Sequence, residues 1–596
     1  MRYKIALIIF LLFWGVMIVR LYHVSIKSNF YYQKLAKENI ERKQFIKPVR
    51  GEVMDANGNL LAMNQIGFSI SIEPHLKIQS STLETVVDTL VNSFPDLNKT
   101  IMMKVYEKNN SPYNHKFIKV VDFIHYPDMM GAYPKLSLIP QIQIEAETKR
   151  YYPYGKYCSH IVGYTGRSNE KENKEDSVVN EVGKVGKSGL EKYYNDILQG
   201  ELGHEVSKVT ATNKTIDILE KEAPKDNKNL KLNIDINLQK MIYEHFVGKT
   251  GVAVVMRTNG EILAAVSYPS YDPNLFVGGI SSKDWKALQE DLAHPFTNKF
   301  IHGTYPPGST IKMGMALAFS KAKKGILDTN EFCSGHIKLG TSNHKFRCWS
   351  TWGHGSVDLR KAIRESCDVY FYNKSLKVGI DAMAKYLRSF GLGVPTGVDL
   401  PDEYAGVIPD KAWKMKRYKQ PWYLGETVIA SIGQGYDLVT PLQLARHTNL
   451  IATSHLVTPR IAKQVDNEEV NISSTPISFN PYYLSEIRKG MYEVCNTRKG
   501  TAFATMGSLP IVVAGKTGTS QVTSIPQAAV KRLKEEELAY FHRSHAWITT
   551  YAPYENPQYI VTVLIEHGGH GGSVAGPIAA DIYKWLYGNG YFKNQE

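Results

Sequence analysis

Apolar residues cluster most densely at the start of the chain. Residues 5–19 are apolar apart from Gly15, and the stretch extends to Ile26 if Arg20 and His23 reach toward a membrane interface. At 1.5 Å per residue a helix over residues 5–26 is about 30 Å long, the thickness of a hydrocarbon core. No small-x-small cleavage site of a signal peptide follows. We predict a four-residue cytoplasmic tail (1–4) and an uncleaved transmembrane anchor (5–26).

The next part of the chain, residues 27–228, changes pattern several times. Residues 50–62 predict strand, turn and strand around the pair Asn57-Gly58, and residues 83–94 have helical periodicity. Three polar stretches predict a helix-compatible segment, an exposed loop and a linker, at residues 32–47, 167–187 and 200–228. We expect a β-rich domain over residues 27–228.

From residue 229 onward, apolar strands alternate with longer helical stretches. Strands are predicted at residues 251–256 and 262–266, and helices at residues 308–324 and 359–376. Residues 229–590 therefore predict a mixed α/β domain, and the whole chain a multidomain α+β protein.

Composition supports a globular protein and excludes some functions. The 71 Lys and Arg residues exceed the 57 Asp and Glu residues by 14, and 43% of the residues are hydrophobic. This balance excludes a disordered or fibrous chain. The basic excess is spread along the chain without a nucleic-acid-binding motif, so it favours a polyanionic neighbourhood such as a membrane surface, and we expect no nucleic acid partner.

The stretch Pro306-Pro307-Gly308-Ser309-Thr310-Ile311-Lys312 is the most informative for chemistry. The prolines and glycine precede an apolar helical run, so Ser309 falls in the first turn of a helix. Spacing of three places Lys312 on the same face, where a desolvated amine could take the hydroxyl proton. The same Ser-x-x-Lys spacing at Ser320 lacks a preceding turn and predicts an ordinary helix face.

Two further motifs follow in order. Ser366-Cys367-Asp368 opens an apolar run and could equally be a helix N-cap, and Lys516-Thr517-Gly518 ends an apolar stretch that we predict to be a strand. A second Lys-Thr-Gly lies at residues 249–251, before the serine. Only the later copy completes the order that an active-site serine acyltransferase needs.

Together these motifs resemble the penicillin-binding proteins, and within them class B. Further matching stretches lie at residues 50–62, 150–153, 186–191, 232–235 with Gln239, and 432–435. Asp368 stands where Asn is the commoner family residue, a pattern similar to the elongation-specific branch. The resemblance implies a membrane anchor, an elongated non-catalytic pedestal (27–228) and a transpeptidase domain (229–590) with an antiparallel sheet flanked by helices.

The resemblance also implies a serine acyl-enzyme mechanism. Ser309 would attack the penultimate D-Ala carbonyl of a stem peptide ending in D-Ala-D-Ala, with Lys312 as the proton acceptor. Ser366 would relay a proton to the leaving amine, and Asp368 would hold the side chains of Lys312 and Lys516.

The strand bearing the third motif would bind the substrate. The resemblance assigns Thr517, Gly518 and Thr519 to this role, with the two threonines binding the substrate carboxylate beside Lys516. The backbone amides of Ser309 and Thr519 would form the oxyanion hole.

Three of the five cysteines lie within 35 residues of one another, at Cys333, Cys348 and Cys367, with His354 between the last two. A structural zinc site with three thiolates and one imidazole would use all four residues, with His344 as the competing imidazole. A disulfide would leave one thiol over, and unlinked thiols are the third alternative. The spacing is not that of a compact zinc knuckle, but zinc is the favoured alternative because it uses all of these residues.

The resemblance implies where the enzyme works and with what. It implies a single-pass inner-membrane protein with a periplasmic catalytic domain, which cross-links peptidoglycan during elongation, has carboxypeptidase activity and is inhibited by β-lactams. A RodA-type glycosyltransferase and an MreC-type scaffold would be its partners.

Two other functions would use the same motifs. A β-lactam-hydrolysing or β-lactam-sensing protein would leave the pedestal without a role, and a purely structural protein would not need Ser309, Lys312 and Lys516 intact. One further cluster, His567 and His570, lies in a glycine-rich connector that lacks companion ligands, so we do not expect it to bind metal.

Overall fold

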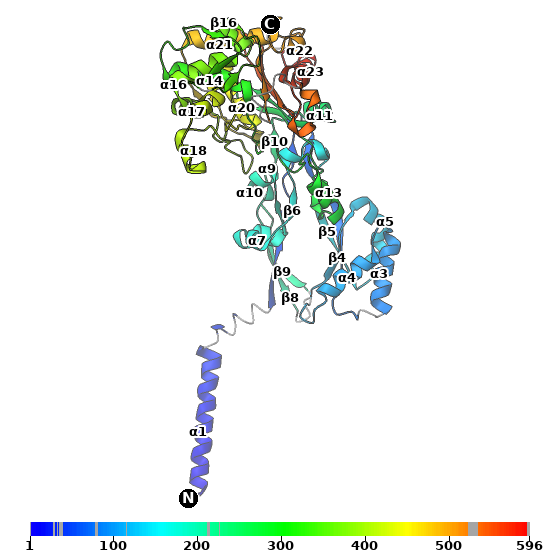
Figure 1. Cartoon of the computed structure of the whole chain (residues 1–596). Coiled ribbons are helices and arrows are strands. Elements are labelled where there is room, and N and C mark those ends of the chain that lie inside the picture. The colour runs from blue at the N-terminus through cyan, green and yellow to red at the C-terminus, as the bar shows by residue number, and fades with distance from the viewer. Residues whose placement is uncertain are drawn as a thin grey trace. The chain divides into compact units, whose positions relative to one another are not determined.

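The computed structural model describes residues 2–27, 30–31, 34, 40–77, 81–114, 116–210, 215–225, 227–341, 343–522 and 534–592. The chain divides into two compact units (Figure 1). The first comprises residues 1–51, 168–184 and 196–228, and the second comprises residues 52–167, 185–195 and 229–596. The domain boundaries expected after residues 26 and 228 stay predictions.

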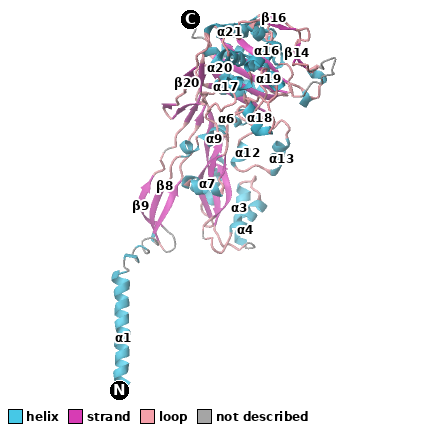
Figure 2. Cartoon of the chain, turned by 60° about the vertical axis from the view of Figure 1, so that its left-hand side comes forward, coloured by secondary structure: helices cyan, strands magenta, loops and turns pink. Residues whose placement is uncertain are grey.

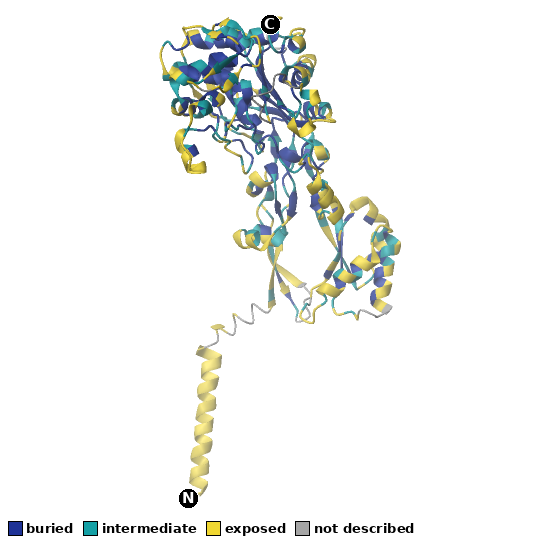
Figure 3. Ribbon diagram, in the orientation of Figure 1, coloured by how far each residue is buried: buried dark blue, intermediate teal, exposed yellow. Residues whose placement is uncertain are grey.

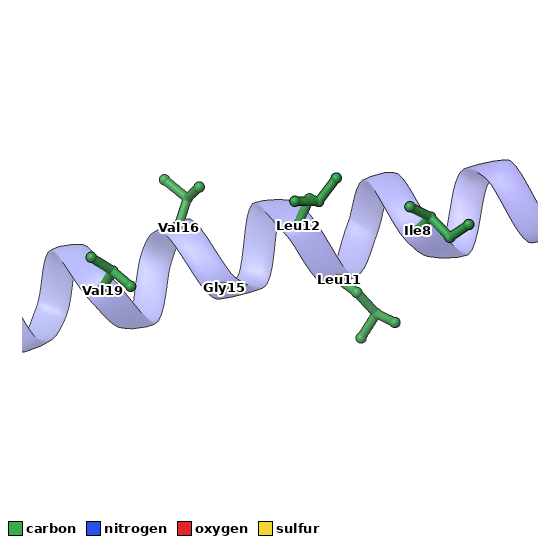
Figure 4. A pocket seen from close by; sticks show the side chains of 6 residues that line it. All are labelled: Ile8, Leu11, Leu12, Gly15, Val16 and Val19. Carbon is green, nitrogen blue, oxygen red and sulfur yellow. The ribbon is translucent and has the colours of Figure 1, made fainter.

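The first unit begins with a long apolar helix, α1 (Arg2–Tyr22), which continues into a π-helical turn, η1 (His23–Lys27). Arg2–Lys27 is the helix, among the described residues, that is long and apolar enough to cross a membrane. Its side chains are exposed along the whole length (Figure 3), as suits a helix surrounded by lipid. Gly15 leaves an apolar notch on its surface (Figure 4), bordered by Ile8, Leu11, Leu12, Val16 and Val19.

The rest of the first unit contains a three-stranded antiparallel sheet in the order β1 (Glu41–Ile46), β8 (Gly203–Val209) and β9 (Thr215–Glu222). The predicted linker over 200–228 was therefore wrong, as was the helical interpretation of residues 41–46; residues 32–33 and 35–39 of that segment lie outside the described residues. The strands β1 and β9 are exposed on both faces, so no apolar alternation marks them in the sequence.

The predicted loop over residues 167–187 was also wrong. It contains two short helices, α7 (Glu170–Glu175) and α8 (Ser177–Val182), and a strand, β7 (Lys184–Gly186). Asn169 and Glu172 form a capping box at the start of α7, with hydrogen bonds of 2.9 and 2.7 Å, and this local pairing supports a helix that has no apolar face.

In the second unit, one sheet runs in the order β19 (Glu468–Glu469), β18 (Ala462–Val465), β10 (Leu230–Leu232), β2 (Val53–Met54), β3 (Leu60–Ile72) and β4 (Ile118–His125), and β5 (Ile142–Tyr151) also pairs with β3. The strand–turn–strand prediction over residues 50–62 is confirmed. Three helices, α3 (Ser81–Ser93), α4 (Lys99–Asn109) and α5 (Tyr126–Leu136), belong to the same core as β3 to β5, through residues such as Leu90, Tyr106 and Met129.

The second sheet of this unit is antiparallel throughout. Its order is β12 (Ile262–Tyr268), β11 (Thr250–Arg257), β23 (Tyr559–Glu566), β22 (His545–Ala552) and β21 (Ala514–Ser520). Helices α11 (Ile236–His245) and α23 (Gly576–Gly588) pack on one face through an apolar core, and α20 (Pro441–Thr453) packs on the other (Figure 1). The expected antiparallel sheet flanked by helices is confirmed.

Candidate active site

The serine motif lies where a tight turn meets a helix. Gly308–Ile311 form a 3-10 turn, η3, and α14 (Lys312–Ala322) follows it. Gly308 has φ +54°, and its N–H donates to the Gly433 carbonyl at 2.9 Å. A side chain on Gly433 would prevent this approach, because its Cβ would lie 2.4 Å from the Gly308 carbonyl oxygen. Ser309 is therefore held half-buried by backbone contacts on both sides of the turn.

The strand β21 runs directly beside this turn. A Cβ on Gly518 would lie 2.9 Å from the Thr310 methyl group and 3.0 Å from the Pro307 carbonyl oxygen. Gln434 donates to the Thr519 carbonyl at 3.2 Å and so links the strand to the 432–435 stretch. The structure thus brings the first and third motifs together. The apolar run predicted as a strand is extended only from Ala514, so Lys-Thr-Gly lies inside the strand and not at its end.

The two lysines of the motifs are both fully buried. Burial and then the nearby Lys312 charge lower the pKa of Lys516 well below its usual range. Its ammonium donates to the Thr517 carbonyl at 3.0 Å, and Thr517 shares a 2.6 Å hydroxyl bond with Thr501. A carboxylate entering this site would meet a desolvated cation beside hydroxyl donors.

Lys312 joins the first motif to the second. Its ammonium donates to the Ser366 carbonyl at 2.9 Å, to the Ser366 hydroxyl at 3.2 Å and to the Asp368 carboxylate at 2.6 Å. An amine that donates three hydrogen bonds has no lone pair to offer, so in this state it orients Ser366 and Asp368. Among the described residues Asp368 forms an ion pair with Lys312 and none with Lys516, on which its charge still acts by raising the pKa. The expectation that Asp368 holds both side chains stays a prediction for Lys516.

The second motif breaks the helix that the sequence predicts over residues 359–376. Two helices, α15 (Leu359–Arg364) and α16 (Asp368–Val378), are separated by residues 365–367, in which Ser366 has φ +57°. A non-glycine residue in this left-handed region is strained, and here the Lys312 hydrogen bonds to both its carbonyl and its hydroxyl hold it.

The sequence decoys lie in ordinary surroundings. The Ser320 hydroxyl donates to the Leu317 carbonyl within α14 at 2.9 Å, and Lys249 is exposed at the start of β11. The ring of His567 packs edge-to-face with that of His545, with 4.8 Å between the ring centres. Among the described residues, no group that could hold a metal includes His567 or His570.

A cysteine–histidine cluster lies beside Asp368. The ligand atoms of Cys333, Cys348, His354 and Cys367 all lie within 4.8 Å of one another, whereas His344 is outside the group. A tetrahedral Zn²⁺ with Zn–S bonds of about 2.3 Å separates its sulfur ligands by about 3.8 Å, so the donor set and spacing fit this ion. All five cysteines are free thiols, which disfavours the disulfide alternative.

The electrostatics of the cluster favour thiolates. The Cys367 thiol, as a hydrogen-bond donor, lowers the pKa of Cys333 to about 4 and that of Cys348 to about 6. Burial disfavours an imidazolium at His354, but hydrogen bonds with Cys348 and Cys333 raise its pKa to about 9. A soft divalent metal would bind such thiolates and displace the protons of the Cys367 thiol and the His354 ring nitrogen that ligates it.

The cluster is tied to the second motif by two hydrogen bonds. The Trp349 N–H donates to Asp368 Oδ2 at 2.9 Å, and the Asp368 N–H donates to Cys348 Sγ at 3.4 Å. The sequence analysis missed Trp349 and Thr501 because both lie outside the three motifs. Trp349 contacts Asp368 through its backbone N–H, and Thr501 contacts Thr517 through its hydroxyl group. Gln434 lies inside the 432–435 stretch, which was the signal that pointed to it.

Comparisons with known proteins agree on one family. The family model "Penicillin binding protein transpeptidase domain" matches residues 250–584, and "Penicillin-binding Protein dimerisation domain" matches residues 45–232. The peptidoglycan D,D-transpeptidase MrdA of Haemophilus influenzae is 35% identical, with 98% of this chain and 90% of the relative covered. MrdA of Escherichia coli K12 is 33% identical, with 96% and 92% covered.

Solved structures give the same picture. The chain is similar to PBP2 in its complex with MreC from Helicobacter pylori, with 41% identity, a TM-score of 0.84, and 93% of this chain and 100% of that chain covered. It is also similar to Pseudomonas aeruginosa PBP2 in complex with WCK 5153, with 31% identity, a TM-score of 0.69, and 91% and 97% covered.

Proposed function

Because the chain belongs to class B of the penicillin-binding proteins, it is a peptidoglycan D,D-transpeptidase of the cell-elongation type, and we propose that Ser309 carries the acyl group. The observation that supports this choice is the packing of Gly518 of β21 against the turn that holds Ser309. No second serine in the described residues combines that turn, a buried lysine three residues on and an adjacent Lys-Thr-Gly strand.

The proposed reaction begins when the stem-peptide carboxylate binds Lys516, Thr517 and Thr519. The Ser309 hydroxyl oxygen attacks the penultimate D-Ala carbonyl carbon, and the backbone amides of Ser309 and Thr519 stabilise the oxyanion. The Ser309 proton passes through Lys312 and Ser366 to the leaving amine, and terminal D-Ala departs. Lys312 can accept that proton only as a neutral amine, which can donate two of these three hydrogen bonds and keeps a lone pair for the Ser309 proton.

An amine of a neighbouring stem peptide then attacks the acyl-enzyme and forms the cross-link. Water in place of the amine would give carboxypeptidase activity. A β-lactam would acylate Ser309 and inhibit the enzyme, because no amine then resolves the acyl-enzyme. We assign the catalytic domain to the periplasm, with α1 as a single-pass inner-membrane anchor. The expected partners are an MreC-type scaffold, as in the Helicobacter pylori complex, and a RodA-type glycosyltransferase.

The acyl-enzyme assignment is tested by labelling with a fluorescent penicillin followed by mass spectrometry of a digest. Wild type and Ser320→Ala should be labelled on the peptide that contains Ser309, whereas Ser309→Ala should not be labelled. Ser320 is the matched control because it has the same spacing to a lysine in the same helix. An adduct on Ser320 would overturn the assignment.

We also propose that Cys333, Cys348, His354 and Cys367 hold one structural zinc ion. The support is the convergence of four ligand atoms of the right chemistry, and four protein ligands leave no open position for catalysis. Elemental analysis should find about one zinc ion per chain. Cys333→Ser should lose the zinc ion and unfold at a lower urea concentration, whereas Cys158→Ser should retain the zinc ion. Metal-free wild type, or zinc retained by Cys333→Ser, would contradict this site.

A further inference from the structure

Residues 333–354, which contain the paired strands β14 (His336–Lys338) and β15 (Lys345–Arg347), are named here the cysteine–histidine hairpin. This hairpin carries exposed aromatic side chains next to the active site. Trp349 is 52% exposed and Trp352 is 95% exposed, although tryptophan is costly to leave in water. The Trp349 indole N–H donates a 2.9 Å hydrogen bond to the Glu365 carbonyl, and the backbone N–H of Trp349 donates to the Asp368 carboxylate at 2.9 Å. The Trp349 side chain is therefore held beside the second motif through Glu365, the residue before Ser366.

A strongly basic segment follows Asp410. Residues 411–425 contain five Lys and Arg residues and no acid, and residues 332–357, which include the hairpin, contain three and no acid. Lys411 pairs with Asp381 at 3.0 Å, and Lys414 is buried against Glu426. Lys416, Arg417 and Lys419 are exposed, and none of the three pairs with a carboxylate in the described part of the chain.

The basic segment is rigidly attached. Lys414 lies over the Tyr423 ring at 4.5 Å, and the Trp422 indole donates to the Thr427 hydroxyl at 2.8 Å. These contacts fix α18 (Lys411–Tyr418) to α19 (Leu424–Ala430). A preorganised cationic surface loses little entropy when it binds a ligand.

The hairpin and the basic segment meet. A Cβ on Gly425 would lie 3.0 Å from the Phe346 ring, and α16 contacts both α19 and β14 (His336–Lys338). Figure 2 shows β14, α16 and α19 close together. We define the basic–aromatic rim as Trp349, Trp352, Lys416, Arg417, Lys419 and Tyr423.

We propose that the basic–aromatic rim binds the polymeric strand of peptidoglycan whose stem peptide reacts at Ser309. The inference deepens the proposed function and rests on it. Sugar rings stack their apolar faces on aromatic side chains, and stem-peptide carboxylates complement the unpaired cations. A ligand that is long, anionic and rich in rings matches this surface, and one seated at Ser309 would pass Trp349, whose N–H contacts Asp368.

The test separates strand binding from acylation in the full-length protein in detergent. Co-sedimentation with purified insoluble peptidoglycan measures the rim, and the rate of labelling by fluorescent penicillin measures the serine site. Lys416→Ala with Arg417→Ala, and separately Trp352→Ala, should each weaken sedimentation by about tenfold and leave labelling within about twofold. Salt should weaken the wild type and the Trp352→Ala variant more than the double cation variant.

Matched controls remove the same chemistry elsewhere. Lys323→Ala with Lys324→Ala deletes two adjacent exposed cations at the far end of α14, and Tyr482→Ala deletes an exposed aromatic on α21 (Pro481–Asn496). Both should sediment like the wild type. Rim variants that co-sediment with peptidoglycan as well as the wild type would overturn the proposal. If such variants also lost binding to a protein partner, the rim would be a protein-docking surface. Equal loss of labelling would overturn it as well, whereas an unlabelled wild type would reject the proposed function instead.

Discussion

Gly314, two residues after Lys312 in α14, is a position where an added methyl group has an unusually clear consequence. A Cβ on Gly314 would lie 2.2 Å from His447 Nε2 and 2.3 Å from its Cε1. The imidazole is fully buried and its Nδ1 lies 3.2 Å from the Phe390 carbonyl oxygen. Neither the ring nor the helix has space to move without disturbing the core.

The expected effect of Gly314→Ala is the sum of two opposing contributions. In a helix interior, alanine is favoured over glycine by about 1 kcal/mol. Forcing a methyl group into a packed core costs typically about 1–3 kcal/mol, and a contact near 2.2 Å falls at or above the top of that range. We expect a net loss of about 2 kcal/mol or more. Acylation by β-lactams should also be slower, because α14 also carries Lys312.

Gly131 supplies the matched control. It lies inside α5, and nothing in the described structure is within 4 Å of a Cβ added there. Gly131→Ala should therefore raise the urea midpoint while Gly314→Ala lowers it, and Gly314→Ala with His447→Ser should recover part of the loss. If both single variants were stabilised alike, the inferred clash with His447 would be refuted.

Three other predictions concern charges. Lys516→Ala should abolish penicillin labelling, a loss of roughly 2–4 kcal/mol in transition-state stabilisation, whereas Lys249→Ala should label almost normally; equal losses would mean that the wrong Lys-Thr-Gly was chosen. Glu191→Ala should lower the free energy of unfolding in urea by about 3–5 kcal/mol, because Arg150, paired with Glu191 at 2.7 Å, would stay buried without its counter-charge. Lys192→Ala breaks an exposed ion pair and should cost under about 1 kcal/mol. Similar losses for the two variants would contradict the argument from burial. Burial lowers the pKa of His447 to about 4, so only the unfolded chain takes up this proton as the pH falls from 6.5 toward 4. This group alone should lower the free energy of unfolding by about 2 kcal/mol at pH 5, and His447→Gln should remove that contribution in urea titrations at several pH values. If the free energy of unfolding of His447→Gln fell with pH as steeply as that of the wild type, the prediction would be wrong.

The sequence predicted the site better than it predicted the first unit. Ser309, Lys312 and Lys516 stand in stretches with strong local signals, a Pro-Pro-Gly turn and an apolar run, so their elements were identifiable. The strands β1 and β9 are solvated on both faces, and β1 pairs with residues of β8 more than 150 positions away. Neither periodicity nor local turn chemistry therefore marks this sheet in the sequence.

Within the site, the sequence could not show where the second motif turns. Residues 359–376 have continuous helical periodicity, and the break at Ser366 is held by hydrogen bonds from Lys312, more than 50 residues away. The ion pair of Asp368 has the same origin, because only the folded structure shows that its partner is Lys312. Long-range contacts thus override local propensity at the point where chemistry is expected.

At the break between α15 and α16, three consecutive residues, Ser366, Cys367 and Asp368, belong to two different sites. Ser366 and Asp368 contact Lys312, while Cys367 between them belongs to the cysteine–histidine cluster. Mutations that would alter β-lactam acylation by moving this loop also move a cluster residue, so the two properties cannot be varied independently by selection. We expect resistance substitutions to accumulate around β21 and the Gly433 turn, which border Ser309 without sharing a residue with the cluster.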